Sequence, residues 1–252
     1  MTSVLTPPGT EDLVATVRDT ARDQGLVAAL VLLHRTAGEA VLPAGDGGYV
    51  LLPPETAAAC GHFTTGSGPR PRGPEAPEQE LGSVRADRPG DRLVALRVEG
   101  AGHPGDRWRA GVLAARLGAA DRLLRQATDR LRDRRVQGSS TLKLSLVRSL
   151  VAEAALGIAE ARALTADTPG SAELHRAHRA LDASGRTCLH LFGASGYLTD
   201  GPGSAIRASE LLGDVYAAPA RPTPPDTTAP DTTPPDATAP DTDRPDTDQE
   251  PT

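Results

Sequence analysis

From Asp106 onward, apolar residues recur every three or four positions, the spacing that places them on one face of an α-helix. The first helical stripe runs from Val112 to Leu131, and three more follow over about 141–166, 171–192 and 204–216. The connections between them are short. Helices that each have one apolar face and are joined by short connections are typical of an antiparallel four-helix bundle, so we expect a bundle domain at 105–218.

Before this domain the pattern is mixed. Apolar residues at helical spacing between Glu11 and Asp23 predict a short helix, with Thr10 as its N-terminal capping residue. Uninterrupted apolar runs at Leu26–Leu33 and Tyr49–Leu52 flank glycine-rich turns and predict strands, and Leu93–Val98 predicts one more. Residues 1–104 therefore indicate a small, loop-rich α+β region, and the chain as a whole is predicted to be mainly α-helical.

The end of the chain has a different composition. From Arg221 onward a Pro-Asp step recurs every five residues and no large apolar residue occurs, so residues 219–252 are predicted to be a disordered tail. Such a repeat most often acts as a spacer. The tail contains two arginines and eight acidic residues, and its net charge of −6 equals that of the whole chain. The preceding body is thus balanced, which argues against nucleic acid or an acidic membrane as a general partner.

Neither the N-terminus nor the most apolar internal stretch of the sequence predicts export or a membrane span. The first twelve residues lack a basic start followed by an apolar run, and Leu26–Leu33 is too short to cross a bilayer. In a chain without export signals, Cys60 and Cys188 are expected to be reduced thiols. These features predict a cytoplasmic protein.

The segment from Leu189 to Ala218 reads LHLFGASGYLTDGPGSAIRASELLGDVYAA and resembles the closing segment of the acyl-CoA dehydrogenases. The residues that align with the family pattern are Gly193, Gly196, Tyr197, Asp200, Pro202 and Tyr216. Upstream, Leu117–Leu164 is similar to the family's preceding helix pair, with Arg134, Gly138 and Glu153 in the expected order. The resemblance covers about half of the chain.

The resemblance implies a cofactor and an assembly. In this family the C-terminal bundle forms the centre of a homotetramer, and FAD lies between the bundle and a β-domain across a subunit boundary. Carried over by position, Arg134 would contact a phosphate, while His190, Gly193 and Ala194 would line the adenine side. Arginine offers a permanently charged fork to phosphate oxygens, and glycine permits close backbone approach.

The family's catalytic residue is missing. These enzymes remove an α-proton with a glutamate while hydride leaves the β-carbon for the flavin. Here Ala217 occupies the position of that glutamate. The alternative family position, near the start of the first bundle helix, holds Trp108 beside Arg109. We therefore assign no catalytic residue. The region at 1–104 is also about half as long as the family's N-terminal and middle domains.

Two hypotheses follow. The first is an acyl-CoA dehydrogenase-like flavoprotein component, an oxidoreductase on acyl thioesters that is degenerate or depends on a complete partner subunit. The second is a non-catalytic helical oligomerisation or regulatory module derived from that family. Bound flavin, which would colour the protein yellow, distinguishes the two.

Other motifs favour structural interpretations. Arginines of the first bundle helix alternate with aspartates, so we expect a solvated or ion-paired face rather than a nucleic-acid site. His175 and His178 have a spacing that metals can use, but no third ligand accompanies them, and a surface pair is favoured. Ser195 lies in an incomplete Gly-x-Ser-x-Gly motif and is not predicted to be a nucleophile. Trp108 is expected to anchor the first bundle helix in the core.

Overall fold

The structure is a computed structural model that describes residues 10–37, 40–165, 170–198 and 201–217. The predicted disordered tail at 219–252 and Asp200 of the family pattern lie outside the described residues.

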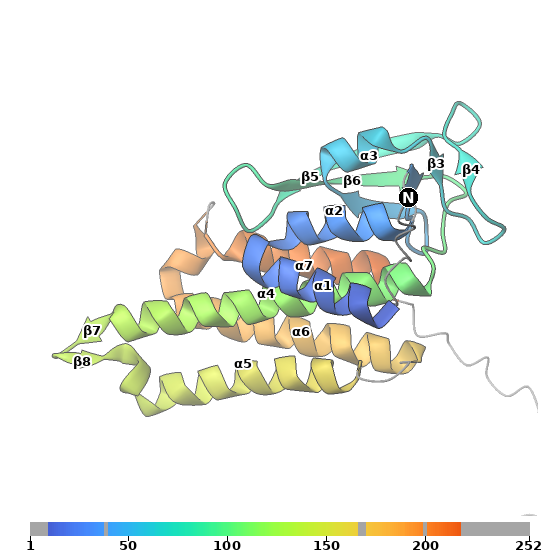
Figure 1. The fold of residues 1–252 in the computed structure, drawn as a ribbon. Coiled ribbons are helices and arrows are strands. Elements are labelled where there is room, and N and C mark those ends of the chain that lie inside the picture. The colour runs from blue at the N-terminus through green and yellow to red at the C-terminus, as the bar shows by residue number, and fades with distance from the viewer. Residues whose placement is uncertain (1–9, 38–39, 166–169, 199–200, 218–252) are drawn as a thin grey trace, which may run out of the picture. The chain divides into compact units, whose positions relative to one another are not determined.

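Four helices form the predicted bundle: α4 (Asp106–Asp133), α5 (Ser145–Ala163), α6 (Ser171–Phe192) and α7 (Gly203–Tyr216). Successive helices run in opposite directions (Figure 1). The α4–α5 connection contains a two-stranded hairpin, β7 (Arg135–Val136) and β8 (Ser139–Ser140), followed by the 3₁₀ turn η1 (Thr141–Lys143). A second 3₁₀ turn, η2 (Gly193–Tyr197), leads toward α7. The four-helix prediction is confirmed, although the second helix begins at Ser145 rather than at about Thr141.

Helix α1 (Thr10–Gln24) lies along α4 (Figure 1). Gly118 makes this close approach feasible, because a Cβ atom there would lie 2.0 Å from the carbonyl oxygen of Arg18. The predicted helix at Glu11–Asp23 is confirmed. Thr10, predicted to precede and cap it, is its first helical residue.

The prediction of a strand at Leu26–Leu33 is wrong, because these residues form most of helix α2 (Leu26–Ala37). An apolar run of this length fits a buried helix as well as a buried strand. Gly25, with φ of 102°, turns the chain after α1, and Asp87 Oδ1 accepts a 3.1 Å hydrogen bond from the Leu26 N–H at the start of α2. This cap comes from 61 residues away in sequence, so local pattern could not reveal it.

Two small sheets lie beside these helices. The first has the order β2-β6-β5, all antiparallel, formed by β2 (Tyr49–Leu52), β6 (Arg92–Val98) and β5 (Glu78–Arg85). The second has the order β1-β3-β4, formed by β1 (Val41–Leu42), β3 (His62–Phe63) and β4 (Arg70–Pro71). Helix α3 (Pro54–Ala59) connects them. Strands at Tyr49–Leu52 and Leu93–Val98 were predicted correctly, whereas β5 was not predicted.

The largest hydrophobic cluster joins the α+β region to the bundle. It combines buried residues of α1, α2, β2 and β6 with Trp108 and Val112 of α4 and Leu212 and Tyr216 of α7. Two smaller clusters lie within the bundle, one around Leu123 and Phe192 and the other around Leu117 and Leu181. The start of α4 and the end of α7 are therefore fixed against the sheet.

Three further expectations concern the chain's surface and thiols. Cys60 and Cys188 are buried free thiols, as predicted.

Arginines of α4 form ion pairs, Arg132 with Asp129 and Arg122 with Asp87, which confirms the ion-paired helix face. Within the described ranges, no helix combines the length and the apolar character that crossing a bilayer requires.

Candidate functional site

The end of α7 holds the position that the family gives to its catalytic base. Tyr216 is completely buried, and its hydroxyl oxygen accepts a 3.1 Å hydrogen bond from the Leu51 N–H of β2. Ala217 follows at once and is half-buried, and its N–H donates to the Gly213 carbonyl oxygen over 2.8 Å. Burial raises the pKa of the Tyr216 phenol, so this hydroxyl stays protonated. The helix end is well anchored, but Ala217, at the family position of the base, has no side chain that can take a proton.

The alternative base position, at the start of α4, is filled by a structural residue. Trp108 is 2% exposed, and its ring meets those of Tyr216 and His34 edge-on, with centroid distances of 5.7 Å and 6.3 Å. The prediction of a core anchor is confirmed. The adjacent Arg109 forms a 3.0 Å ion pair with Asp46. Neither family position therefore provides a catalytic carboxylate.

Arg134, the predicted phosphate ligand, is the first residue after α4 and is exposed. Its carbonyl oxygen accepts hydrogen bonds from the Thr141 N–H (2.8 Å) and hydroxyl (2.9 Å), which fix the backbone. In the described part of the chain, no hydrogen bond or ion pair holds its guanidinium group. The side chain is therefore available to an external anion.

The three predicted adenine-side residues lie where α6 ends. His190 in the last turn of α6 is exposed, as is Ala194 in η2. Gly193 between them has φ of 58° and ψ of −143°, a conformation that suits glycine, and nothing lies within 4 Å of where its Cβ would be. The last turns of α4 and α6 lie at the same end of the bundle (Figure 1), and Leu131, Leu191 and Phe192 share one hydrophobic cluster.

Three of these four residues, Arg134, His190 and Gly193, have chemistry that is compatible with one half of a flavin nucleotide. An unpaired guanidinium, an exposed imidazole and an open glycine backbone suit a diphosphate and an adenine ring. All four are at least partly exposed, so the walls that would enclose such a ligand have to come from outside this segment.

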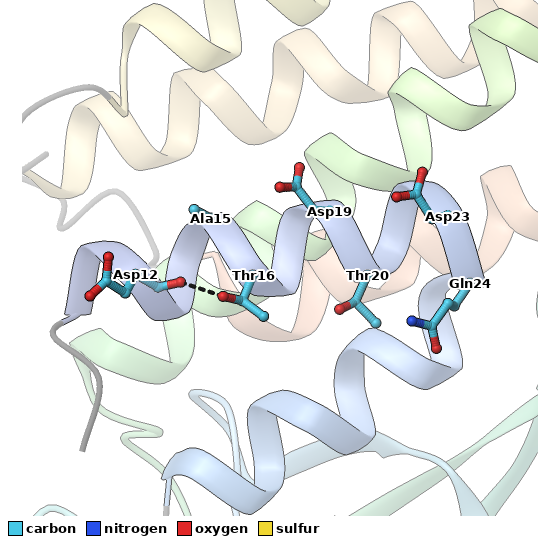
Figure 2. Close-up of a pocket in the computed structure, with 7 residues that line it drawn as sticks. All are labelled: Asp12, Ala15, Thr16, Asp19, Thr20, Asp23 and Gln24. Carbon is cyan, nitrogen blue, oxygen red and sulfur yellow. Dashed lines mark hydrogen bonds between the residues drawn. The ribbon is translucent and has the colours of Figure 1, made fainter. Parts of the chain in front are cut away.

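A groove elsewhere on the surface has the wrong charge for a flavin phosphate. Figure 2 shows that its lining comes from a single face of α1, whose residues are Asp12, Ala15, Thr16, Asp19, Thr20, Asp23 and Gln24. Two of its carboxylates pair with Arg22, at 3.0 Å from Asp19 and 2.9 Å from Asp23. We assign no ligand to this groove.

A buried charged cluster inside the bundle was not predicted from sequence. Arg116 of α4 is completely buried, and it donates to His178 Nδ1 and Asp182 Oδ1 of α6 and, over 3.1 Å, to Ser209 Oγ of α7. Gly213 leaves the necessary space, because a Cβ there would lie 2.2 Å from Arg116 Nη1. One arginine thus joins three bundle helices. The sequence signal that could have identified Arg116 as buried is its position in the apolar stripe of α4, four residues after Val112.

The structure corrects the prediction of a surface histidine pair. His175 is half-buried and His178 is only 3% exposed. Burial, followed by the charge of Arg116, lowers the pKa of His178 to about 3. His178 is therefore neutral, and its Nδ1 serves as the acceptor for Arg116. Among the described residues, no group of three or more histidine, cysteine or acidic side chains is arranged to hold a metal ion.

We expect acid to destabilise the fold through His178. Its pKa is about 3 when folded and 6.5 in its ordinary state, so between these values the unfolded chain binds a proton that the folded chain does not. The contribution of neutral His178 to the free energy of unfolding is therefore complete above pH 6.5, and it declines as the pH falls from 6.5 toward 3. Linkage gives a loss of about 2 kcal/mol from this group between pH 7 and pH 5, measurable by urea unfolding at both.

The matched variant for this experiment is His178→Asn. Its amide oxygen can accept a hydrogen bond but does not titrate. We expect its free energy of unfolding to change less over the same pH interval. An equal pH dependence in the two proteins would show that His178 is not the group responsible.

Comparison with known proteins supports the fold assignment. No protein-family model matches the sequence, and no curated protein matches it. Solved structures do match. The steroid acyl-CoA dehydrogenase Tcur3481-Tcur3483 is 15% identical, with 81% of this chain and 76% of that chain covered and a TM-score of 0.56. The ChsE4-ChsE5 complex from Mycobacterium tuberculosis is 16% identical, with 82% and 76% covered and a TM-score of 0.55.

A third match is the FAD complex of PigA, which is 10% identical, with 82% of this chain and 79% of that chain covered and a TM-score of 0.56. Sequence identity this low establishes the fold alone. The chain has the acyl-CoA dehydrogenase fold, in agreement with the resemblance of its closing segment.

Proposed function

We propose that this chain is a subunit of an acyl-CoA dehydrogenase-like flavoprotein that does not supply the catalytic base, and that a complete homologous partner supplies it. The observation that carries this proposal is the end of α7, where a buried, hydrogen-bonded Tyr216 is followed by Ala217 at the position of the family's glutamate. The anchoring of the helix remains although the carboxylate is absent. A mixed assembly accounts for both facts.

Two of the structural matches favour this arrangement. Tcur3481-Tcur3483 and ChsE4-ChsE5 are each named as a pair of different chains. PigA was solved with FAD. By analogy, the present chain would contribute one wall of a flavin site, and its substrate would be an acyl thioester bound at the partner's base.

In this proposal, the residues at the shared end of α4 and α6 hold the ADP half of FAD. Arg134 neutralises phosphate charge, His190 offers a hydrogen-bonding ring, and the open backbone of Gly193 permits close approach. FAD, when bound, supplies the acceptor for the hydride that leaves the acyl β-carbon. This chain's part is to bind and orient, since none of these residues moves a proton from substrate.

The first test is the visible absorbance spectrum of the purified chain after addition of FAD and removal of the excess, alone and together with a full-length homologue. We expect retained flavin in the mixed sample. Arg134→Ala should weaken flavin retention about tenfold or more, since a charge-assisted hydrogen bond contributes about 1.5–3 kcal/mol. Arg132→Ala is the control, because Arg132 is also exposed but is already paired with Asp129.

A second test asks whether the missing carboxylate is the only catalytic defect at this helix end. In a flavin-loaded complex whose homologous subunit lacks its glutamate, we expect Ala217→Glu to produce acyl-CoA oxidation. Ala217→Gln, of the same size but without a basic carboxylate, should stay inactive. Protein that is colourless alone and with the homologue would contradict the proposal and favour a helical oligomerisation module.

A further inference from the structure

Side chains from beyond the β7–β8 hairpin close the end of helix α4. The helix ends at Asp133, and the hairpin follows at the end of the bundle (Figure 1). The last carbonyl oxygens of a helix have no partner within the helix itself. Here the Ser140 hydroxyl donates to the Leu131 carbonyl oxygen over 3.0 Å, and the Thr141 hydroxyl donates to that of Arg134 over 2.9 Å. The two hydroxyls therefore stop the helix at this point.

Thr141 makes a second bond to the same atom. Its N–H donates to the Arg134 carbonyl oxygen over 2.8 Å, and the residue is only 8% exposed. Arg134 itself has φ of −71° and ψ of 123°, which is extended rather than helical backbone. A free carbonyl oxygen here could accept the N–H four residues on, as in a continued helix, and each residue of a helix turns the side-chain direction by about 100°. The bonds from Thr141 thus keep Arg134 outside the helix and fix the direction in which it leaves the backbone.

Of three arginines close together at this helix end, two are engaged. Arg132 pairs with Asp129, and the Arg135 guanidinium donates to the Gly138 carbonyl oxygen over 3.3 Å within the hairpin. Among the described residues, no hydrogen bond or ion pair engages the guanidinium of Arg134. The backbone of Arg134 is therefore held at a residue whose charged group is exposed and free.

We propose that Thr141 is a positioning residue for the flavin phosphate site, because its hydroxyl holds Arg134 in the direction from which the guanidinium meets the diphosphate. This inference rests on the proposed function, in which Arg134 binds that anion. Thr141 is buried and does not contact the ligand. It contributes by preorganisation, since an arginine whose backbone is already fixed loses less conformational freedom on binding.

Fluorescence titration of FAD with the mixture of this chain and a full-length homologue measures the contribution, with the homologue alone as the blank. Thr141→Val keeps the shape of the side chain and removes the hydroxyl. We expect FAD binding to weaken about threefold, a factor typical of one neutral hydrogen bond. Adding Ser140→Ala also frees the Leu131 carbonyl oxygen and should bring the loss to about tenfold. Thr141→Ser, which keeps the hydroxyl, should bind FAD as the unmodified chain does.

Thr128→Val is the matched control. The Thr128 hydroxyl also donates to a carbonyl oxygen of α4, that of Arg125 over 2.8 Å, but it lies more than one turn before the helix end. We expect its FAD binding to be unchanged. Urea unfolding of both valine variants should give similar losses of stability, so a difference between them in FAD binding does not reflect a weaker fold.

Combination with Arg134→Ala separates positioning from a general structural role. If Thr141 acts through Arg134, then Thr141→Val has no further effect on FAD binding once the guanidinium is gone. A loosened bundle end would instead weaken binding by the same factor in both backgrounds. Equal factors in the two backgrounds overturn the inference.

The Cα chemical shift of residue 134 in the chain alone provides a readout without flavin. We expect an extended value in the unmodified chain and a change toward the helical value in the Ser140→Ala/Thr141→Val double variant. FAD binding that Arg134→Ala weakens but the double variant leaves unchanged overturns this inference alone. A mixture that binds no more FAD than the homologue by itself overturns the proposed function as well.

Discussion

Replacing Arg116 with methionine is expected to lower the free energy of unfolding by about 3 kcal/mol, the low end of the range for removing one partner of a buried ion pair. The guanidinium is completely buried and bonds to three side chains on two other helices. Without it, Asp182, whose side chain is 22% exposed, loses its partner charge, and His178 and Ser209 lose a hydrogen-bond partner. Urea unfolding followed by far-ultraviolet circular dichroism measures the loss.

Arg186→Met is the matched control for this variant. Arg186 also lies on the bundle and also forms an ion pair, with Glu210 of α7 at 3.0 Å, but its side chain is 69% exposed. We expect a loss below about 1 kcal/mol, as for other exposed pairs. Similar losses in the two variants would mean that burial of Arg116 does not determine its contribution to stability.

The second large effect is expected for Trp108→Ala, at about 3–5 kcal/mol. The indole lies in the cluster that joins the sheet to the bundle, where it contacts the rings of His34 and Tyr216. Its removal leaves a cavity at the junction of these elements. Because Trp108 is the only tryptophan, unfolding has to be followed by circular dichroism rather than by fluorescence.

Trp108→Phe separates packing from hydrogen bonding. The indole N–H is buried and, within the described residues, has no acceptor in good hydrogen-bond geometry, although it acts on the nearby Tyr216 hydroxyl, so phenylalanine removes a poorly satisfied donor while it keeps an aromatic ring. We expect a loss below about 1.5 kcal/mol for this variant. A loss from Trp108→Ala as small as that would show that the junction tolerates the cavity and that the tryptophan is not an anchor.

The bundle could be predicted because its signal is local. Amphipathic stripes identified the four helices. Strand β5 could not be predicted, for the opposite reason. Most of Glu78–Arg85 is exposed and polar, so its place in the sheet depends on backbone pairing with β6 rather than on alternating apolar residues. The helix α2 was predicted as a strand because eight apolar residues in a row have no period that distinguishes a helix from a strand.

The candidate site also contains residues that the sequence could indicate and residues that only the tertiary structure reveals. Arg134, His190, Gly193, Ala194 and Ala217 could be nominated only through resemblance to a family, since nothing in their local pattern specifies a ligand. Arg116 was overlooked because its partners lie 62 to 93 residues away. The surrounding arginines of α4 are ion-paired or solvated, and only tertiary structure distinguishes this one from them.

The hydrogen bond between Tyr216 and Leu51 has a consequence for protein engineering. It joins the last turn of α7 to the central part of the fold, so the backbone at residue 217 starts from a fixed point. A side chain introduced at this position is held by an anchored helix end. No loop has to be redesigned and no helix has to be extended. The chain is accordingly a ready scaffold for installing a general base by changing a single residue.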